Sequence, residues 1–240
     1  MDMQRGVRFY DDNGIIDFHT RRDMEITMTN KVINLPDAKV NVIDVPGRDG
    51  SLDLTAAIGR TRYKNRTLVF NFVYADAKSM AAERMLQKLG SYIQGKKMNI
   101  VEDDDPTHYY IGRCSISSIS TEPYVTKFHI TCDCEPYRYD IYNNGLWEWD
   151  SFDFENDIAT DYEDITFNGS ICVLVVAGDK IVFPEFICSD AMSVECNGNI
   201  YQLNRGSNTP ELILIPGVNT LIFRKNGMGV VNIRYRGGYL

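Results

Sequence analysis

Histidine is scarce in this sequence, with three residues, His19, His108 and His129, among 240. A serine or cysteine nucleophile usually relies on an adjacent base, and the sequence offers few histidines for that role. The Gly-x-Ser-x-Gly motif and the phosphate-binding Gly-Lys-Ser/Thr loop are both absent. The glycines at 47 and 50 lack a surrounding dinucleotide-binding fingerprint and favour a surface turn. We therefore expect no enzymatic activity and no cofactor.

Long hydrophobic runs are also missing. The longest apolar stretches, at 171–177 and 212–215, are far shorter than the roughly 20 residues that a membrane-spanning helix needs. The N-terminal residues lack the apolar centre of a signal peptide. Basic residues are outnumbered, and the net charge of -8 disfavours binding to nucleic acid or to anionic membranes. We expect no membrane insertion and a protein that stays in the cytosol of the cell that makes it.

Six cysteines, at 114, 132, 134, 172, 188 and 196, are expected to be free thiols in a cytosolic product. Cys132 and Cys134 lie two apart in a strand-like run, so they share a face and resemble small core residues. A metal site needs further close ligands, and no second short cysteine pair supplies them. We expect no metal site.

Carboxylates cluster at 102–105 and again at Asp150, Asp153, Glu155 and Asp157. Paired carboxylates can hydrolyse glycosides, as in a wall-degrading glycosidase, and carboxylate clusters can bind calcium. Neither cluster has the spacing of a calcium loop. A solvated turn for the first and a solvated linker face for the second are the favoured interpretations.

The dominant pattern is that of short β-strands separated by Gly, Asn and Asp. Residues 6–10 and 15–18 flank Asn13-Gly14 and predict a hairpin, and further strands are predicted at 24–29, 39–45 and 66–74. Leu68, Phe70, Phe72 and Tyr74 alternate with more polar positions. The run at 124–134 alternates in the same way, which is typical of antiparallel sheet with one wetter face.

One helix is predicted, at about 77–93. Asp76 is a candidate N-cap and Gly95 a candidate stop. Met85 or Leu86, Leu89 and Ile93 recur at helical spacing, so one stripe of the helix is expected to pack on an apolar surface.

The second half of the chain is predicted to be nearly all β. A linker is expected at 143–145, dividing the chain into domains at 1–142 and 146–240. Strands are predicted at 162–167, 171–176, 181–187, 192–196, 199–203, 211–215, 218–223 and 229–236. Turns are expected at Asn168-Gly169, Gly178-Asp179, Asn197-Gly198, Pro216-Gly217 and Asn226-Gly227. This spacing favours a β-sandwich or jelly roll.

Trp147 and Trp149 lie two apart, so both rings would face the same way on a strand. Exposed, together with Tyr162, they would form a platform on which sugars or a partner protein could stack, and the domain would be a carbohydrate-binding module for bacterial surface glycans. Burial is the favoured interpretation because large apolar groups are usually covered.

Four local patterns follow one another in the first 140 residues. They are Val45-Pro46-Gly47-Arg48-Asp49-Gly50, Tyr63-Lys64-Asn65-Arg66 before an apolar strand, Asp104-Asp105-Pro106-Thr107-His108-Tyr109-Tyr110-Ile111-Gly112-Arg113, and Cys134-Glu135-Pro136-Tyr137. The order of these four patterns resembles the order found in the siphophage distal tail protein family. Residues 146–240 resemble the C-terminal domain of that family only in size and β content.

This resemblance implies a mainly β fold with one helix (α+β), with a tail-tube-like belt domain at 1–142 and a galectin-like β-sandwich at 146–240. It implies a structural virion protein at the tail tip of a long-tailed phage or prophage, assembled as a hexameric ring. The implied partners are copies of itself, the tail tube protein, and fibre or receptor-binding proteins. DNA would pass through the ring without specific binding, which an acidic chain suits because it repels phosphate.

A closed ring needs two different surfaces on each subunit. The segments at 39–62 and 100–120 are candidates, because extended elements and open sheet edges can pair across subunits. Arg48 and Arg66 are candidate interface or turn residues, since arginine suits bidentate pairing with carboxylates. For Arg48 an ordinary exposed side chain is equally compatible. For Arg66 it is the favoured interpretation.

Overall fold

The computed structural model of the chain describes residues 5–55, 57, 59–75, 79–122, 124–141 and 162–240. The chain divides into two units, Met1–Pro136 together with Leu240, and Tyr137–Tyr239. Both units are built mainly from antiparallel strands, as the sequence predicted. The linker expected at 143–145 lies outside the described residues.

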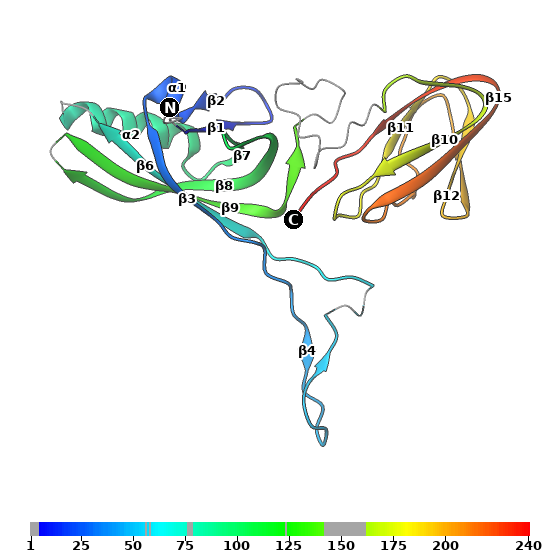
Figure 1. The fold of residues 1–240 in the computed structure, drawn as a ribbon, viewed down its shortest axis with the longest axis horizontal. Coiled ribbons are helices and arrows are strands. Elements are labelled where there is room, and N and C mark those ends of the chain that lie inside the picture. Colours follow the sequence, from blue (N-terminus) through cyan, green and yellow to red (C-terminus); the bar gives the residue numbers. More distant parts are fainter. Residues whose placement is uncertain (1–4, 56, 58, 76–78, 123, 142–161) are drawn as a thin grey trace. The chain divides into compact units, whose positions relative to one another are not determined.

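The first unit contains a seven-stranded sheet with the strand order β2–β1–β7–β8–β9–β6–β3 (Figure 1). Its strands are β1 (Val7–Tyr10), β2 (Asp17–His19), β3 (Thr27–Ile33), β6 (Arg66–Ala75), β7 (Lys97–Glu102), β8 (Asp105–Glu122) and β9 (Val125–Asp140). The segment between β3 and β6 carries a separate two-stranded ladder, β4 (Val42–Ile43) and β5 (Leu52–Asp53).

The core of the first unit follows from the alternation in β6 and β9. Leu68, Phe70 and Phe72 are buried on one face of β6, and the ring of Phe72 stacks on that of Phe128 with 5.6 Å between centroids. The intervening residues of β6 remain partly exposed. One face of the sheet is therefore dry, as the period of two requires.

Helix α2 (Ser79–Ile93) covers part of this dry face, and its Met85, Leu89 and Ile93 join the core (Figure 1). The predicted apolar stripe is confirmed. The candidate cap Asp76 lies outside the described residues. Gly95 follows the helix with a positive φ of 71°, as expected of its stop.

A second helix was not predicted. Helix α1 (Thr20–Met24) is a single turn after β2, capped by the His19 side chain and ended by Glu25 in the left-handed region, with φ of 58°. The predicted strand at 24–29 is therefore displaced and becomes β3. The prediction that Tyr124 begins the next strand was also wrong, because Tyr124 has φ of 71° and is 70% exposed in the turn before β9.

The second unit contains six strands: β10 (Ile165–Val176), β11 (Glu185–Cys188), β12 (Met192–Cys196), β13 (Asn199–Leu203), β14 (Gly206–Asn208) and β15 (Val218–Arg234). Their order is β13–β12–β15–β11–β14, and β10 also pairs with β15. Phe186, Phe223 and Val194 lie in its buried core. β15 connects the unit because it pairs with β10, β11 and β12.

Several strand boundaries in this unit differ from the prediction. Asn168-Gly169 and Asn226-Gly227 were expected to be turns, but β10 and β15 each run through as one strand with an irregularity between Asn168 and Ser170. Residues 211–215 form no strand and contribute one bridge, between Leu214 and Val182. Asn-Gly marks a positive φ, and a bulge uses that conformation as well as a turn does. Neither helix of the described residues is long and apolar enough to span a bilayer.

Candidate assembly surfaces

The segment at 34–65, which we call the arm, is the most exposed part of the first unit. Backbone hydrogen bonds join its two sides: Lys64 N donates to Asp37 O at 2.8 Å, and Lys39 N donates to Arg62 O at 2.7 Å. Further out, β4 pairs with β5. Figure 1 shows the arm running away from the sheet as a narrow ribbon. An isolated two-stranded ribbon is marginal in water, so the arm depends on what holds its base and covers its sides.

Arg66 holds the base of the arm. Its Nε donates to the carbonyl oxygen of Asn34 at 2.9 Å, and its Nη1 donates to that of Pro136 at 3.3 Å. The guanidinium also lies over the ring of Tyr110. Arg66 is 3% exposed, so the interpretation of an ordinary surface arginine was wrong. Its hydrogen bonds fix the path of its own chain.

The sides of the arm carry apolar side chains that nothing in the described chain covers. The exposed ones are Leu35, Val40, Val42, Ile43 and Val45. Leu35 and Val40 are 75% and 66% exposed. Exposed apolar surface gathered on one projection marks an interaction site, whereas single exposed residues are ordinary.

Arg48 lies in the exposed turn at the far end of the arm, where its backbone N–H donates to Val45 O at 3.1 Å. Gly47 and Gly50 have positive φ in the same turn, which explains the two glycines of that motif. The turn that the sequence predicted here is confirmed. An interface role for the Arg48 side chain stays a prediction.

The sheet of the first unit ends in two edge strands, β2 and β3. β2 is three residues long, and its Asp17 carboxylate accepts two hydrogen bonds from the Arg8 guanidinium, at 2.8 and 2.7 Å. β3 is longer and leads directly into the arm. Short, charged edges resist further pairing, whereas a longer open edge can accept a strand from another molecule. The other segment predicted to pair, at 100–120, lies inside the sheet, with β8 between β7 and β9.

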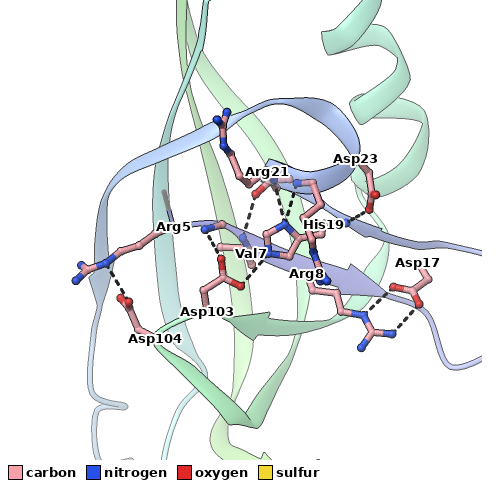
Figure 2. A network of polar contacts seen from close by, with 12 residues as sticks. Arg5, Val7, Arg8, Asp17, His19, Arg21, Asp23, Asp103 and Asp104 are labelled. Atoms are coloured by element: carbon pink, nitrogen blue, oxygen red, sulfur yellow. Dashed lines mark hydrogen bonds and ion pairs between the residues drawn. The ribbon is translucent and has the colours of Figure 1, made fainter. Parts of the chain in front are cut away.

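A network of polar contacts fixes the N-terminal corner of the unit (Figure 2). His19 Nδ1 accepts from the backbone N–H groups of Arg21 and Arg22 at 3.2 and 3.1 Å. The proton of the neutral ring therefore sits on Nε2, which donates to Asp103 Oδ1 at 2.8 Å. The second oxygen of Asp103 accepts from Gly6 N at 2.7 Å. The turn after β7 is thereby tied to β1, β2 and α1.

The solvated turn predicted for the acidic cluster at 102–105 is confirmed at Asp103 and Asp104, but Glu102 lies in β7 and is buried. Glu102 is 3% exposed and pairs with Lys31, whose Nζ also lies 2.9 Å from Asp104 Oδ2. Burial raises the pKa of Glu102, and the hydrogen bond from Lys31 offsets part of that rise. Burial lowers the pKa of Lys31, but the hydrogen bonds that its ammonium donates to Glu102 and Asp104 outweigh this effect and leave the pKa raised. No group of three or more side chains among the described residues is arranged to hold a metal ion.

An outward apolar patch occurs in the second unit. The bridge between Val182 and Leu214 turns both of those side chains inward, and it leaves Phe183 and Ile213 67% and 41% exposed. Together with Pro184, Thr209, Pro210 and Glu211 they line a shallow groove of about 540 Å³. This groove could not be predicted from the sequence, because a run of alternating apolar residues at 211–215 does not reveal which side of the segment stays uncovered.

The tryptophan pair and the second acidic cluster lie outside the described residues. Trp147, Trp149 and the carboxylates at 150–157 thus stay predictions, as does the carbohydrate-binding module built on them. Tyr162 is described, and its hydroxyl donates to Leu174 O at 3.1 Å while its ring packs on Tyr235. It is part of the second unit's packing.

A family model described as the phage tail protein RIFT-related domain matches residues 12–134, just over half of the chain. The chain belongs to this family of phage tail proteins. The predicted resemblance to siphophage tail proteins is confirmed, and the match covers the arm, α2 and the sheet apart from β1 and the end of β9. No curated protein sequence matches the chain.

A solved structure of a phage tail protein shares the fold of this chain. SPP1 Dit (gp 19.1), described as a paradigm of the hub adsorption apparatus in phages that infect Gram-positive bacteria, superposes with a TM-score of 0.63 at 13% identity, over 98% of this chain and 99% of that one. A chain of the phage P2 baseplate in its activated conformation with Ca gives 0.42 at 11% identity, over 96% and 98%. At such low identity the similarity to SPP1 Dit establishes the fold of this tail protein and no more.

Proposed function

We propose that this tail protein is a structural subunit of the hub at the distal end of a long non-contractile tail, where copies of it close into a ring. The observation that carries the proposal is the arm. It is pinned at its base by Arg66 yet exposes Val40, Val42 and Ile43 along its length. Such an arm is complete only when another surface covers it.

A second copy of the chain is the occupant that fits. A closed ring joins one surface of each subunit to a different surface of the next, and the arm and the open edge of β3 are two such surfaces. Charge favours the same pairing. The arm carries five basic and four acidic side chains, whereas the whole chain has a net charge of -8. A slightly basic arm is attracted to the more acidic body of a neighbour.

The remaining features are consistent with the same assignment. The likeness to the hub protein of SPP1 and the siphophage resemblance support a hexamer, with a belt domain in the first half and a galectin-like sandwich in the second. The tail tube protein and fibre or receptor-binding proteins would be its neighbours. DNA would cross the ring without specific binding, because an acidic lining repels phosphate. A structural subunit of this kind requires no enzymatic activity.

The test compares the oligomeric state of the full chain with that of an arm variant. We expect the wild-type protein to form rings, seen by light scattering and by negative-stain imaging. Replacing Val42 and Ile43 with aspartate should leave a folded monomer, with unchanged circular dichroism. Ile200→Asp, an exposed apolar residue on β13, serves as the matched control and should leave the ring intact.

Two results would count against the proposal. One is a wild-type chain that stays monomeric at high concentration and with its tail partners present. The other is a ring that forms equally well with both aspartates in the arm.

A further inference from the structure

Three cysteines lie together in the core of the first unit, and nothing in the proposed ring function uses them. Cys114 is on β8, and Cys132 and Cys134 are on β9. All three are fully buried. The sulfur atoms of Cys132 and Cys114 are 3.1 Å apart, well inside ordinary van der Waals separation. The prediction that Cys132 and Cys134 share a core face is confirmed, but the sequence did not show their proximity to Cys114.

The register of β8 against β9 brings Cys114 and Cys132 directly opposite each other. A Cβ at Gly112 would lie 2.3 Å from Cys134 Sγ, and Ser115 Oγ donates to Thr131 O at 3.4 Å. The first contact pairs Gly112 with Cys134 and the second pairs Ser115 with Thr131, and the two pairs imply the same register between β8 and β9. Cys114 and Cys132 thus form a cross-strand pair, while Cys134 faces a glycine.

The backbone of Cys114 shows which kind of pair this is. Its N–H donates to Lys96 O at 3.0 Å, and its carbonyl accepts from Gly95 N at 2.8 Å. Both polar groups therefore point toward the β7 side and away from β9. Cys114 and Cys132 occupy a non-hydrogen-bonded position, where Cα atoms lie about 4.5 Å apart and the side chains approach most closely. That separation falls within the range that a disulfide spans.

Two other roles for the thiols fit less well. The described residues contain no group of three or more side chains arranged to hold a metal ion. Burial raises the pKa of Cys132, and it also raises that of Cys134, so a nucleophilic thiolate is disfavoured at both positions. Cross-linking of the adjacent pair is the chemistry that the geometry permits.

We propose that Cys114 and Cys132 form a disulfide that joins β8 to β9 when the protein meets a low-molecular-weight disulfide as oxidant. When local opening of the sheet exposes the pair, one cysteine attacks the oxidant as its thiolate and releases one thiol, and the second cysteine then displaces the other half. A bond forms between the two Sγ atoms, the S–S bond of the oxidant breaks, and the two protons and two electrons leave with its two thiols. A reducing cytosol keeps the pair reduced, whereas oxidising surroundings outside the cell favour the cross-link.

Mass spectrometry of the full chain tests this directly. The purified protein is incubated with oxidised glutathione until its thiol content is constant, and free thiols are then alkylated. Trypsin cuts after Arg113, Lys127 and Arg138, which places Cys114 on the peptide 114–127 and both other cysteines on 128–138. We expect these two peptides to be linked, with a mass two hydrogens below the sum of their separate masses.

Two variants identify the partner. In Cys134→Ala the link must persist, since only Cys132 remains on the second peptide, and in Cys132→Ala it should be lost. The oxidised wild type should also unfold at a Tm higher by about 5 °C or more, because the link restricts the unfolded chain. Unlinked peptides in oxidised Cys134→Ala, or a link in Cys132→Ala equal to that of the wild type, would overturn the proposal.

Discussion

The guanidinium carbon of Arg66 lies 5.2 Å from the centroid of the Tyr110 ring, with the arm starting beside it. Tyr110 is on β8 and Arg66 begins β6, and β9 separates the two strands in the sheet. The same guanidinium donates to Asn34 O and Pro136 O. One side chain therefore connects both ends of the arm's base to Pro136 on β9.

Replacing Arg66 with methionine should destabilise the protein strongly. The variant keeps a long side chain but leaves two carbonyl oxygens without their donor, and it removes the cation from the tyrosine ring. We expect the free energy of unfolding to fall by about 2–4 kcal/mol, measured by urea denaturation. Arg48→Met, in the exposed turn at the far end of the arm, should change it by less than about 0.5 kcal/mol. Equal effects at the two positions would show that Arg66 does not anchor the arm.

Local periodicity explains which parts of this fold were predictable. The buried face of β6 and the stripe of Met85, Leu89 and Ile93 depend on spacings of two and of three to four residues, which are legible in the sequence. Helix α1 was missed because it is one turn long and its N-cap is His19, which is not among the usual capping residues.

The site was harder to predict because its features are set by long-range contacts. Arg66 is bonded to residues 32 and 70 positions away, and an arginine is exposed in most proteins. Cys114 and Cys132 meet only because β8 and β9 have one particular register. For a related reason, the sequence could not show that the apolar side chains of the arm are exposed. Alternation predicts a one-sided strand but not whether that side is covered.

The pH dependence of stability should change in opposite directions when two carboxylates are removed. Burial raises the pKa of Glu102, so the folded protein holds this proton more tightly than the unfolded chain does. That contribution is present at low pH and is lost as pH rises through the folded pKa. Glutamine does not titrate, so Glu102→Gln lacks this pH-dependent loss of stability. The stability of the variant relative to the wild type should therefore increase between pH 4 and pH 7.

Asp17 provides the matched comparison. The hydrogen bond from Arg8 lowers the pKa of Asp17, so its contribution is present at neutral pH and is lost on acidification. The stability of Asp17→Asn relative to the wild type should therefore decrease as pH rises from about 2 to about 5, through the unfolded pKa of aspartate, and by a small amount because the pair is half exposed. Denaturant titrations at several pH values give both slopes. Two slopes of the same sign would contradict the environment described for Glu102.

Gly178 should tolerate no side chain, for two separable reasons. It has φ of 72°, and its backbone forms a parallel bridge with Gly238. A Cβ at Gly178 would lie 2.6 Å from the carbonyl oxygen of Gly238. Gly198 has a similar φ of 78° with nothing within 4 Å of its Cβ position, so Gly198→Ala isolates the cost of the backbone conformation, about 1 kcal/mol. Gly178→Ala adds overpacking against backbone and should cost about 1–3 kcal/mol more in thermal or denaturant unfolding. If the two alanine variants were equally stable, the C-terminal segment at 237–239 would not be packed against Gly178 in solution.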